Sequence, residues 1–374
     1  MDGGTGAAAA PPPPPPPPPV ALPTTADAAA PSLPPWTDPP WWPPPVEAAA
    51  FGDTTYELVC GEGGDAANAA AAAAAASAPA APPPPLAAGF HAQRGGRDAM
   101  EDAVAVASPL PTAPGAGPGH LLAVFDGHRG AGAAAFAAGG VVEAVRSAWC
   151  GGQGCSTAAH PAQALAAAFA ALHAGWVAVE ARAAAAAAAA GRPPPSPCGS
   201  TATVALVWRD WLFVACAGDA RAVLVTSSGR VLRLSADHTP GDAGERARCR
   251  GGLALHGAGG LRLGPPALAV TRSLGDADAI PSGLTHAPTV TARRLGGGAG
   301  RDACLVVASD GLYDVLSDAE VGALVRDTVK DAALAAKRLV MEALGRGSGD
   351  NVSAVVAFLR AETTCELVVR DKVK

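Results

Sequence analysis

An apolar run that ends in an acid, a glycine and a histidine constrains this chain more than any other stretch. Residues 121–128 read LLAVFDGH, so five apolar residues lead directly into Asp126, Gly127 and His128. The run is short enough for a buried strand, and Asp-Gly ends it sharply. A carboxylate and a bare backbone carbonyl are ligands that a hard divalent cation prefers, and an imidazole can give a proton to a departing alkoxide. Because Asp-Gly is also a common turn signal, this stretch taken alone favours an ordinary turn.

The first 86 residues differ in composition from the rest of the 374-residue chain. They contain nine consecutive prolines at 11–19, an alanine block, eight acids and no Lys or Arg. Such a segment cannot bury enough apolar side chain to offset the entropy lost on ordering. We predict a disordered acidic tail over residues 1–86, a folded domain over residues 87–361 and a short C-terminal tail over residues 362–374. A strand within residues 51–60 could join the domain.

Tryptophans interrupt the proline-rich tail. Trp36, Trp41 and Trp42 lie among prolines, and a stretch of this kind could dock another protein. An unstructured patch with no binding role is the simpler interpretation, because such patterns are weak.

Composition also bears on location and partners. The N-terminus lacks the positive start and apolar core of a secretory signal, and its acids disfavour a transit peptide. The longest apolar runs are alanine blocks, so we predict no membrane-spanning segment. The eight cysteines form no Cys-x-x-Cys pair, which favours a reducing compartment, and we expect cytoplasm, nucleus or both. The folded part carries a charge of only about +2, which does not support nucleic-acid binding. We expect a monomer.

Predicted strands come in groups and predicted helices in pairs, without βαβ alternation. This arrangement favours an α+β domain built from layered antiparallel sheets. Strands are expected at 89–94, 103–107, 121–125, 201–208, 211–217, 220–226, 230–234, 267–271, 304–309 and 352–359. Helices are expected at 131–149, 161–190, 241–250, 332–345 and from the capping box at Ser317. Residues 251–266 are expected to be a glycine-rich flap and residues 277–300 to be irregular.

Acidic residues stand at the edges of several predicted strands, often beside glycine: Glu101, Asp102, Asp126, Asp219, Asp276, Asp310 and Asp350, with Asp314 one helical turn after Asp310. Each acid taken separately is explained by a turn, a cap or a solvated charge. Together they crowd one rim of the sheet with carboxylates that repel and raise each other's pKa. Divalent cations resolve that conflict, and ligation by oxygen alone points to Mg²⁺ or Mn²⁺ rather than zinc.

Two further side chains complete the predicted site. A pair of such ions activates a water and clamps a phosphate. Arg97 stands one turn before Glu101 and could hold the outer oxygens of that phosphate in a fork. His128 is the only histidine inside the motif of an acid of the cluster.

The chain resembles the metal-dependent Ser/Thr protein phosphatases of the 2C type, and it resembles the plant members of that family most. Eight motifs match in order and spacing: RDAMED at 97–102, VFDGH at 124–128, CGSTA at 198–202, AGDARAV at 217–223, LSADH at 234–238, LAVTRSLGD at 268–276, ASDGLYDV at 308–315 and GDNVS at 349–353. The last third also resembles the phosphatase half of plant proteins that fuse a kinase to this domain, although no kinase motif is present.

The resemblance implies a central sandwich of two antiparallel β-sheets flanked by pairs of α-helices. It also implies a pair of Mg²⁺ or Mn²⁺ ions in a cleft at one sheet edge. By the family pattern, Asp126 bridges both ions, Glu101 and the Gly127 carbonyl hold one, and Asp310 and Asp350 hold the other. Asp102 would act through bound water, and Asp219 and Asp314 match positions that can hold a third, weaker ion.

The implied reaction is hydrolysis of phosphoserine or phosphothreonine in proteins by direct attack of water, without a phosphoenzyme. Arg97 matches the phosphate-binding arginine and His128 the general acid. Two alternatives stay open: a catalytically inactive scaffold, and a metal-dependent hydrolase of a small phosphorylated molecule. The first is disfavoured because inactive domains usually lose ligand acids, and function depends on the site rather than on the fold.

Overall fold

The computed structural model describes part of the chain, all of it within the unit Phe51–Lys374. The described residues are 55–58, 86–110, 119–150, 161–256, 260–296, 301–328 and 331–359. Most of the predicted acidic tail, its tryptophans and residues 362–374 lie outside them, so those predictions and the domain limits stay predictions. The strand expected within residues 51–60 is confirmed over Thr55–Leu58 (β1), which pairs in parallel with Thr289–Arg294 (β14).

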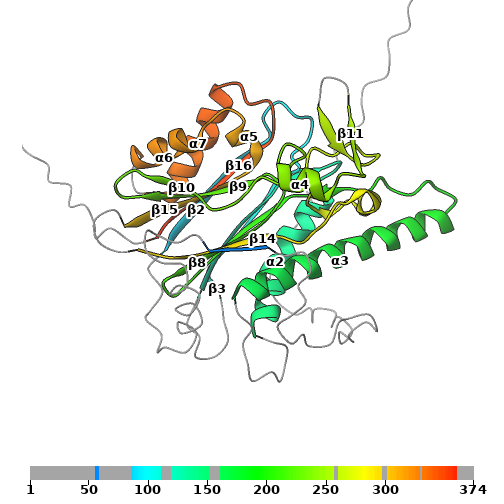
Figure 1. Cartoon of the computed structure of the whole chain (residues 1–374), viewed down its shortest axis with the longest axis horizontal. Coiled ribbons are helices and arrows are strands. Elements are labelled where there is room, and N and C mark those ends of the chain that lie inside the picture. Colours follow the sequence, from blue (N-terminus) through cyan, green and yellow to red (C-terminus); the bar gives the residue numbers. More distant parts are fainter. Residues whose placement is uncertain are drawn as a thin grey trace, which may run out of the picture. The chain divides into compact units, whose positions relative to one another are not determined.

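Two stacked sheets form the centre of this unit (Figure 1). One has six strands in the order β1-β14-β8-β7-β4-β3, and the other has five in the order β10-β9-β15-β16-β2. Apart from the β1–β14 pair, neighbouring strands within both sheets are antiparallel. The other strands of these two sheets are β2 (Ala87–Gln93), β3 (Ala103–Leu110), β4 (Gly119–Phe125), β7 (Ala202–Trp208), β8 (Trp211–Ala217), β9 (Arg221–Thr226), β10 (Val231–Arg233), β15 (Asp302–Ala308) and β16 (Val352–Phe358).

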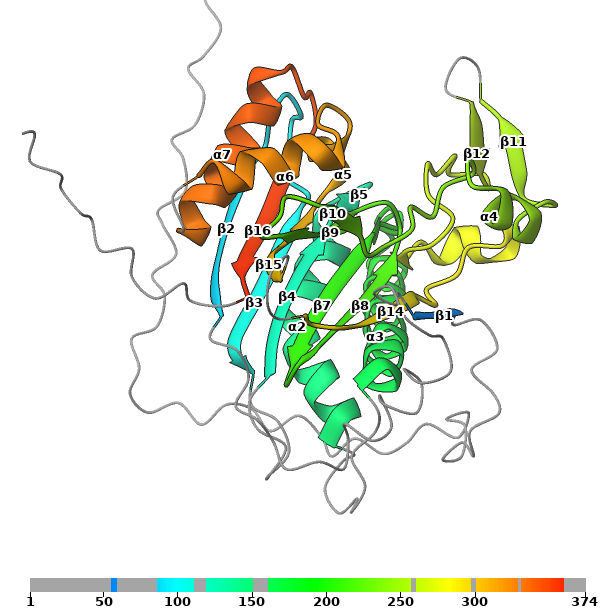
Figure 2. The same cartoon turned by 60° about the vertical axis from the view of Figure 1, so that its left-hand side comes forward.

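Helices cover the outer face of each sheet (Figure 2). The helices α2 (Gly132–Cys150) and α3 (Pro161–Ala189) share a core with the six-stranded sheet. The helices α6 (Asp318–Arg326) and α7 (Ala332–Gly345) share another with the five-stranded sheet. The capping box predicted at Ser317 opens α6. The predicted α+β sandwich with flanking helix pairs is confirmed.

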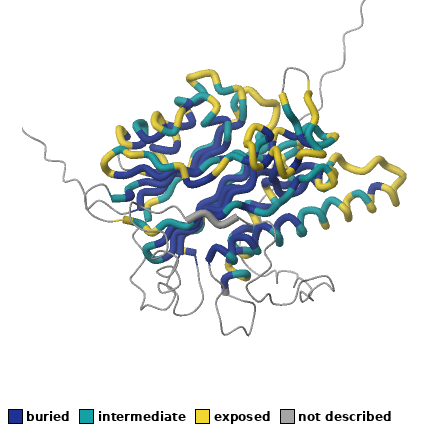
Figure 3. Tube along the Cα trace, viewed as in Figure 1, coloured by how far each residue is buried: buried dark blue, intermediate teal, exposed yellow. Residues whose placement is uncertain are grey.

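Strand β4 shows why its sequence is a continuous apolar run. Leu121 and Phe125 point into the core beneath α2 and α3, whereas Leu122 and Val124 point into the core between the two sheets. All seven residues of β4 are buried (Figure 3). A strand covered on both faces loses the alternation of apolar and polar residues, and burial of both faces stabilises the fold by about 25 cal/mol per Å² of apolar surface.

Helix α3 is the one helix in the described ranges that is long and apolar enough to cross a membrane, with a mean hydropathy of 1.5 over the best window. Of that window, 44% is buried inside the fold. Leu165 and Phe169 are fully buried against the six-stranded sheet. A core helix rich in alanine meets the same length and composition test, so the property carries little weight here.

The segment after β10 departs from prediction. No strand forms at residues 267–271, and the turn at residues 264–267 is closed by a bridge between Leu263 and Leu268. The expected flap is an antiparallel hairpin of β11 (Leu253–Leu255) and β12 (Leu261–Leu263), which follows the short helix α4 (Ala243–Arg248). The strand prediction at residues 267–271 was therefore wrong. The glycine and the prolines before this apolar run form a turn, and no strand begins after it.

Residues 277–300 are not irregular throughout. They include a 3₁₀ helix, η2 (Ala277–Ser282), and strand β14, which pairs with β8 along its whole length. The TVTARR sequence of β14 ends in arginines, and burial of the strand decreases toward that end. Its strand conformation is set by the partner strand more than by local pattern.

Candidate active site

A cleft of about 460 Å³ opens where the ends of the two sheets meet. Carboxylates from segments far apart in the sequence line it. Of the predicted site residues, those lining the cleft are Arg97, Glu101, Asp126, Gly127, His128, Asp219, Asp310 and Asp350. Asp102 and Asp314 do not line it. Residues 266–270 form another wall.

Glycines after the acids allow the segments to come together. A Cβ at Gly127 would clash with the backbone carbonyl of Glu101, and one at Gly311 would clash with the carbonyl of Asn351. The two Asp-Gly pairs therefore do more than end strands. Their second residues let the neighbouring acid-bearing segments approach at backbone distance.

We expect Gly311→Ala to lower the free energy of unfolding by about 3 kcal/mol or more, because the new methyl group meets backbone that cannot rotate away. The matched control is Gly139→Ala on the exposed face of α2, where a Cβ has no neighbour within 4 Å. That change should stabilise the protein by up to about 1 kcal/mol. Denaturant unfolding of both variants measures this, and equal effects would contradict the close-approach explanation.

The backbone of Asp126 is anchored by the strand that faces it. The Asp126 amide donates to Thr201 Oγ1 at 3.2 Å, and its carbonyl accepts from the Thr201 amide at 2.8 Å. Asn351 performs the same task for Glu101, because its Oδ1 accepts from the Glu101 amide at 2.7 Å. Its Nδ2 donates to the carbonyls of Arg94 and Ala99. The carboxylates thus stand on a backbone frame that is already hydrogen-bonded.

Burial and mutual repulsion raise the pKa values of the clustered acids. Burial and the charge of Asp310 hold the pKa of Asp126 well above its usual range. Burial, followed by Asp310, raises the pKa of Asp219 to about 7, and burial, followed by Asp314, raises that of Asp310 to about 6. The charges of both Asp310 and Asp102 contribute to the raised pKa of Asp126. The described acids therefore form one interacting cluster that disfavours its own ionisation.

Asp102 and Asp314 stand outside the cleft lining: Asp102 is half-buried, and Asp314 is exposed. Asp102 Oδ2 accepts from Ser309 Oγ at 2.9 Å, whereas its Oδ1 is buried without a hydrogen-bond partner among the described residues. Burial raises the pKa of Asp102 to about 6. Asp314 follows Asp310 by one helical turn, as predicted, since its amide donates to the Asp310 carbonyl. Burial and the charge of Asp350 raise its pKa.

The arginine and the histidine of the predicted site have acidic partners. Arg97 lies in a bend and not in a helical turn, and its guanidinium donates to Asp350 at 2.6 Å. His128 Nε2 contacts Asp276 Oδ2 at 2.5 Å. Asp276 is fully buried, adopts a left-handed backbone (φ 48°) and also accepts from Ser273 Oγ at 2.7 Å. Sequence reasoning gave Asp276 no role, because its partner His128 lies 148 residues earlier.

The family model described as "Protein phosphatase 2C" matches residues 86–352. The chain belongs to the protein phosphatase 2C family.

Relatives and solved structures agree with that membership. The chain is 41% identical over 172 residues to a "Protein kinase and PP2C-like domain-containing protein" of Arabidopsis thaliana, covering 46% of this chain and 25% of that protein. It is 43% identical over 169 residues to "Probable protein phosphatase 2C 68" of Oryza sativa subsp. japonica, covering 43% and 45%. The matches thus span a quarter to a half of these plant relatives. The fold matches serine-threonine phosphatase 2C from Toxoplasma gondii with a TM-score of 0.60 at 23% identity, covering 75% of this chain and 98% of that one.

The residues of this phosphatase 2C domain have the chemistry of a divalent-cation site, but they are not arranged as a complete coordination shell. Within the described ranges, no three His, Cys, Asp or Glu side chains converge as a metal site in their present arrangement. A cation bound here would draw the carboxylate side chains toward a common point. The donor set is all oxygen, an orphaned buried oxygen of Asp102 is present, and the acids repel one another. These are the properties that Mg²⁺ or Mn²⁺ would satisfy.

The raised pKa values predict how the metal-free protein responds to pH. A carboxyl whose pKa is raised by folding binds its proton more tightly in the folded state, so stability is lost as pH rises through the folded pKa. His173 and His238 have pKa values lowered by burial to about 4. Their contribution to stability is complete only well above their unfolded pKa of about 6.5, so the two together add about 0.8 kcal/mol of stability between pH 6.5 and 8.5.

In chelator, we expect the wild type to lose about 1 kcal/mol more of its free energy of unfolding than Asp219→Asn between pH 6.5 and 8.5, because only the wild type has the Asp219 carboxyl. Saturating Mg²⁺ should remove most of this difference. Urea unfolding of both proteins at the two pH values measures the effect. The same pH dependence in the two metal-free proteins would contradict the repulsion described above.

Proposed function

We propose that this protein is a serine/threonine protein phosphatase that uses two Mg²⁺ or Mn²⁺ ions to hydrolyse phosphoserine and phosphothreonine. The single observation that supports this best is the meeting of Glu101, Asp126, Asp310 and Asp350 in one cleft from four separate segments. A cluster that destabilises its own negative charge is unfavourable in a structural role. It becomes favourable when cations bind to it.

Most of the proposed metal ligands line the cleft. Asp126 would bridge two ions, with Glu101 and the Gly127 carbonyl on one side and Asp310 with Asp350 on the other. Asp102 stands outside the cleft lining and would orient bound water through its free oxygen. Asp219 and Asp314 would hold a third, weaker ion. When bound, the ions supply an activated water and a positive clamp for the phosphate.

Arg97 is suited to bind the substrate phosphate. Its side chain is 59% exposed at the cleft, and its present partner is the carboxylate of Asp350. A guanidinium can exchange its single hydrogen bond to a carboxylate for a forked pair of bonds to a phosphate. Cation binding at Asp350 would weaken its hold on Arg97 and free the guanidinium for the phosphate.

His128 is suited to protonate the departing serine or threonine oxygen. Its ring lines the cleft and is 25% exposed, while its Nε2 contacts the fully buried Asp276. A carboxylate behind an imidazole fixes the ring orientation and the nitrogen that carries the proton. Asp276 would thus be a positioning residue for His128.

Phosphate release from a phosphoserine peptide, with Mn²⁺ or with chelator, tests the proposal. We expect release only with the metal. No release under either condition would favour an inactive scaffold. Preference for small phosphorylated metabolites over the peptide would favour the other alternative.

The remaining expectations about location and assembly are also proposals. We propose the cytoplasm or the nucleus, in keeping with several buried cysteines that form no disulfide among the described residues: Cys198, Cys216, Cys249 and Cys304. Monomeric state and docking through the proline-rich tail stay predictions.

A further inference from the structure

A second groove borders the candidate active site. It has a volume of about 390 Å³ and shares Asp219 and Ala269 with the cleft. The rest of its lining comes from the start of α4 and from the β11–β12 hairpin: Thr239, Pro240, Gly241, Arg246, Leu261 and Arg262. A peptide chain whose phosphorylated residue lies in the cleft could therefore continue into this groove.

The groove carries two arginines that nothing neutralises. In the described part of the chain, neither the Arg246 nor the Arg262 side chain forms an ion pair or hydrogen bond. The acid lining the groove is Asp219, at the end shared with the cleft, where the proposed function engages it with a cation. Away from that end, the groove lining is positive.

The arginines of the same segment that point elsewhere are all engaged, with one exception. Glu245 is buried and accepts from Arg272 at 2.5 Å and from Arg248 at 2.6 Å. Arg250 is the exception, since it is exposed, has no partner among the described residues and does not line the groove. The contrast distinguishes arginines that hold the fold from arginines free to bind a ligand.

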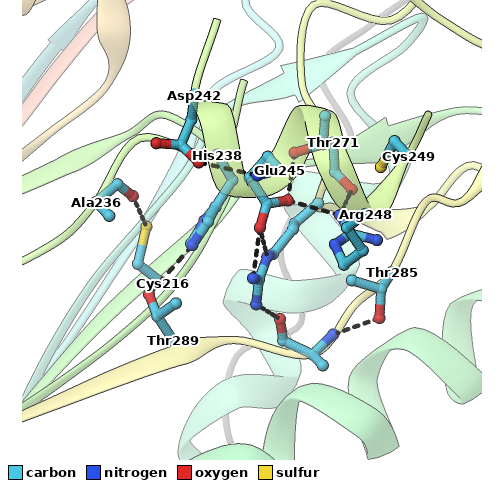
Figure 4. A network of polar contacts seen from close by, with 12 residues as sticks. Cys216, Ala236, His238, Asp242, Glu245, Arg248, Cys249, Thr271, Thr285 and Thr289 are labelled. Carbon is cyan, nitrogen blue, oxygen red and sulfur yellow. Dashed lines mark hydrogen bonds and ion pairs between the residues drawn. The ribbon is translucent and has the colours of Figure 1, made fainter. Parts of the chain in front are cut away.

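A buried polar network holds the groove wall in place. Glu245 also accepts from Thr271 Oγ1 at 2.6 Å, and Asp242 caps α4 through the Glu245 amide (Figure 4). Arg272, whose side chain is 8% exposed, donates to the Ala287 carbonyl. This network ties α4 to Thr271 and Arg272 and, through Arg272, to Ala287. Arg246 therefore projects from a fixed helix, so binding through it needs little reorganisation of the protein backbone.

We propose that this groove is a substrate subsite that selects an anionic side chain near the phosphorylated residue. The inference rests on the proposed function and adds a substrate preference to it. Arginine recognises carboxylates and phosphates in forked pairs, so the anion is an aspartate or glutamate or a second phosphorylated residue. An extended peptide advances about 3.3 Å per residue, so four residues on either side of the target extend about 13 Å along the groove that adjoins the cleft.

Peptide turnover with Mn²⁺ tests this preference. Each phosphoserine peptide would carry one glutamate, scanned through about four positions on either side, against an all-alanine background. We expect at least one position to raise kcat/KM by about fivefold through KM, as for an exposed charge pair, and lysine there to lower it. A further peptide with a non-hydrolysable phosphonate at that position distinguishes the two anion sources. Flat profiles for glutamate and phosphonate would overturn the proposal.

Charge reversal locates the preference on the structure. In Arg262→Glu, the glutamate-to-lysine selectivity should fall to about one or invert. The matched control, Arg250→Glu, changes the net charge equally on the same segment but outside the groove, and should keep the selectivity. An equal loss in both variants would overturn the groove as the source. Wild-type turnover of the all-alanine peptide separates the two proposals, because its absence would count against the phosphatase function itself.

Discussion

Asp310→Asn is expected to abolish metal-dependent phosphate release while leaving the protein folded. Even the outer partners of metal ligands typically cost ten- to a hundredfold when changed, so we expect a loss of more than about a hundredfold. Asp310 lies at the start of helix α5 (Asp310–Tyr313), and its pKa is raised by burial and by neighbouring acids. Removing its charge relieves repulsion in the cluster.

Two measurements distinguish loss of a ligand from loss of the fold. In chelator at pH 8, the Asp310→Asn variant should be at least as stable as the wild type. In Mn²⁺, it should gain less stability than the wild type gains. The matched control is Asp98→Asn, which removes one charge from an exposed side chain lining the same cleft. Undiminished activity in Asp310→Asn would show that Asp310 is not a metal ligand.

His128→Ala is expected to reduce turnover of phosphoserine peptides by about 10²- to 10⁴-fold, the usual contribution of a general acid. An aryl phosphate has a leaving group that departs without a proton, so its turnover should fall far less. Asp276→Asn should show the same dependence on leaving group in weaker form, because Asp276 acts through the His128 ring.

This dependence on leaving group separates proton donation from damage to the fold. A damaged cleft would slow both substrates equally. Equal losses for the peptide and the aryl phosphate in His128→Ala would therefore remove the general-acid role. Equal losses in Asp276→Asn alone would leave Asp276 as a structural residue.

The fold was largely predictable because its strongest signals are local. The apolar run of β4, the paired helices α2 and α3, and the capping box of α6 each follow from residues within one element. The errors fell where tertiary contacts decide. Strand β14 owes its conformation to β8, and the turn at residues 264–267 is closed by the bridge between Leu263 and Leu268.

The candidate site was partly predictable for a different reason. Acids beside glycine could be recognised in the sequence, and eight of the ten predicted side chains and backbone groups line one cleft. The sequence alone could not place Asn351 against Glu101 or Asp276 against His128, because each pair is separated by more than a hundred residues. Nor did it show that Asp102 stands outside the cleft lining, since burial depends on the assembled sheets.

The most direct test of the proposed chemistry is a crystal structure grown in Mn²⁺, with the metal located by its anomalous scattering. We predict two ions in the cleft, with Asp126 between them and oxygens of Glu101, Asp310 and Asp350 in their coordination shells. Ions found only elsewhere, or a cleft in which Asp126, Asp310 and Asp350 bind no common pair, would contradict it.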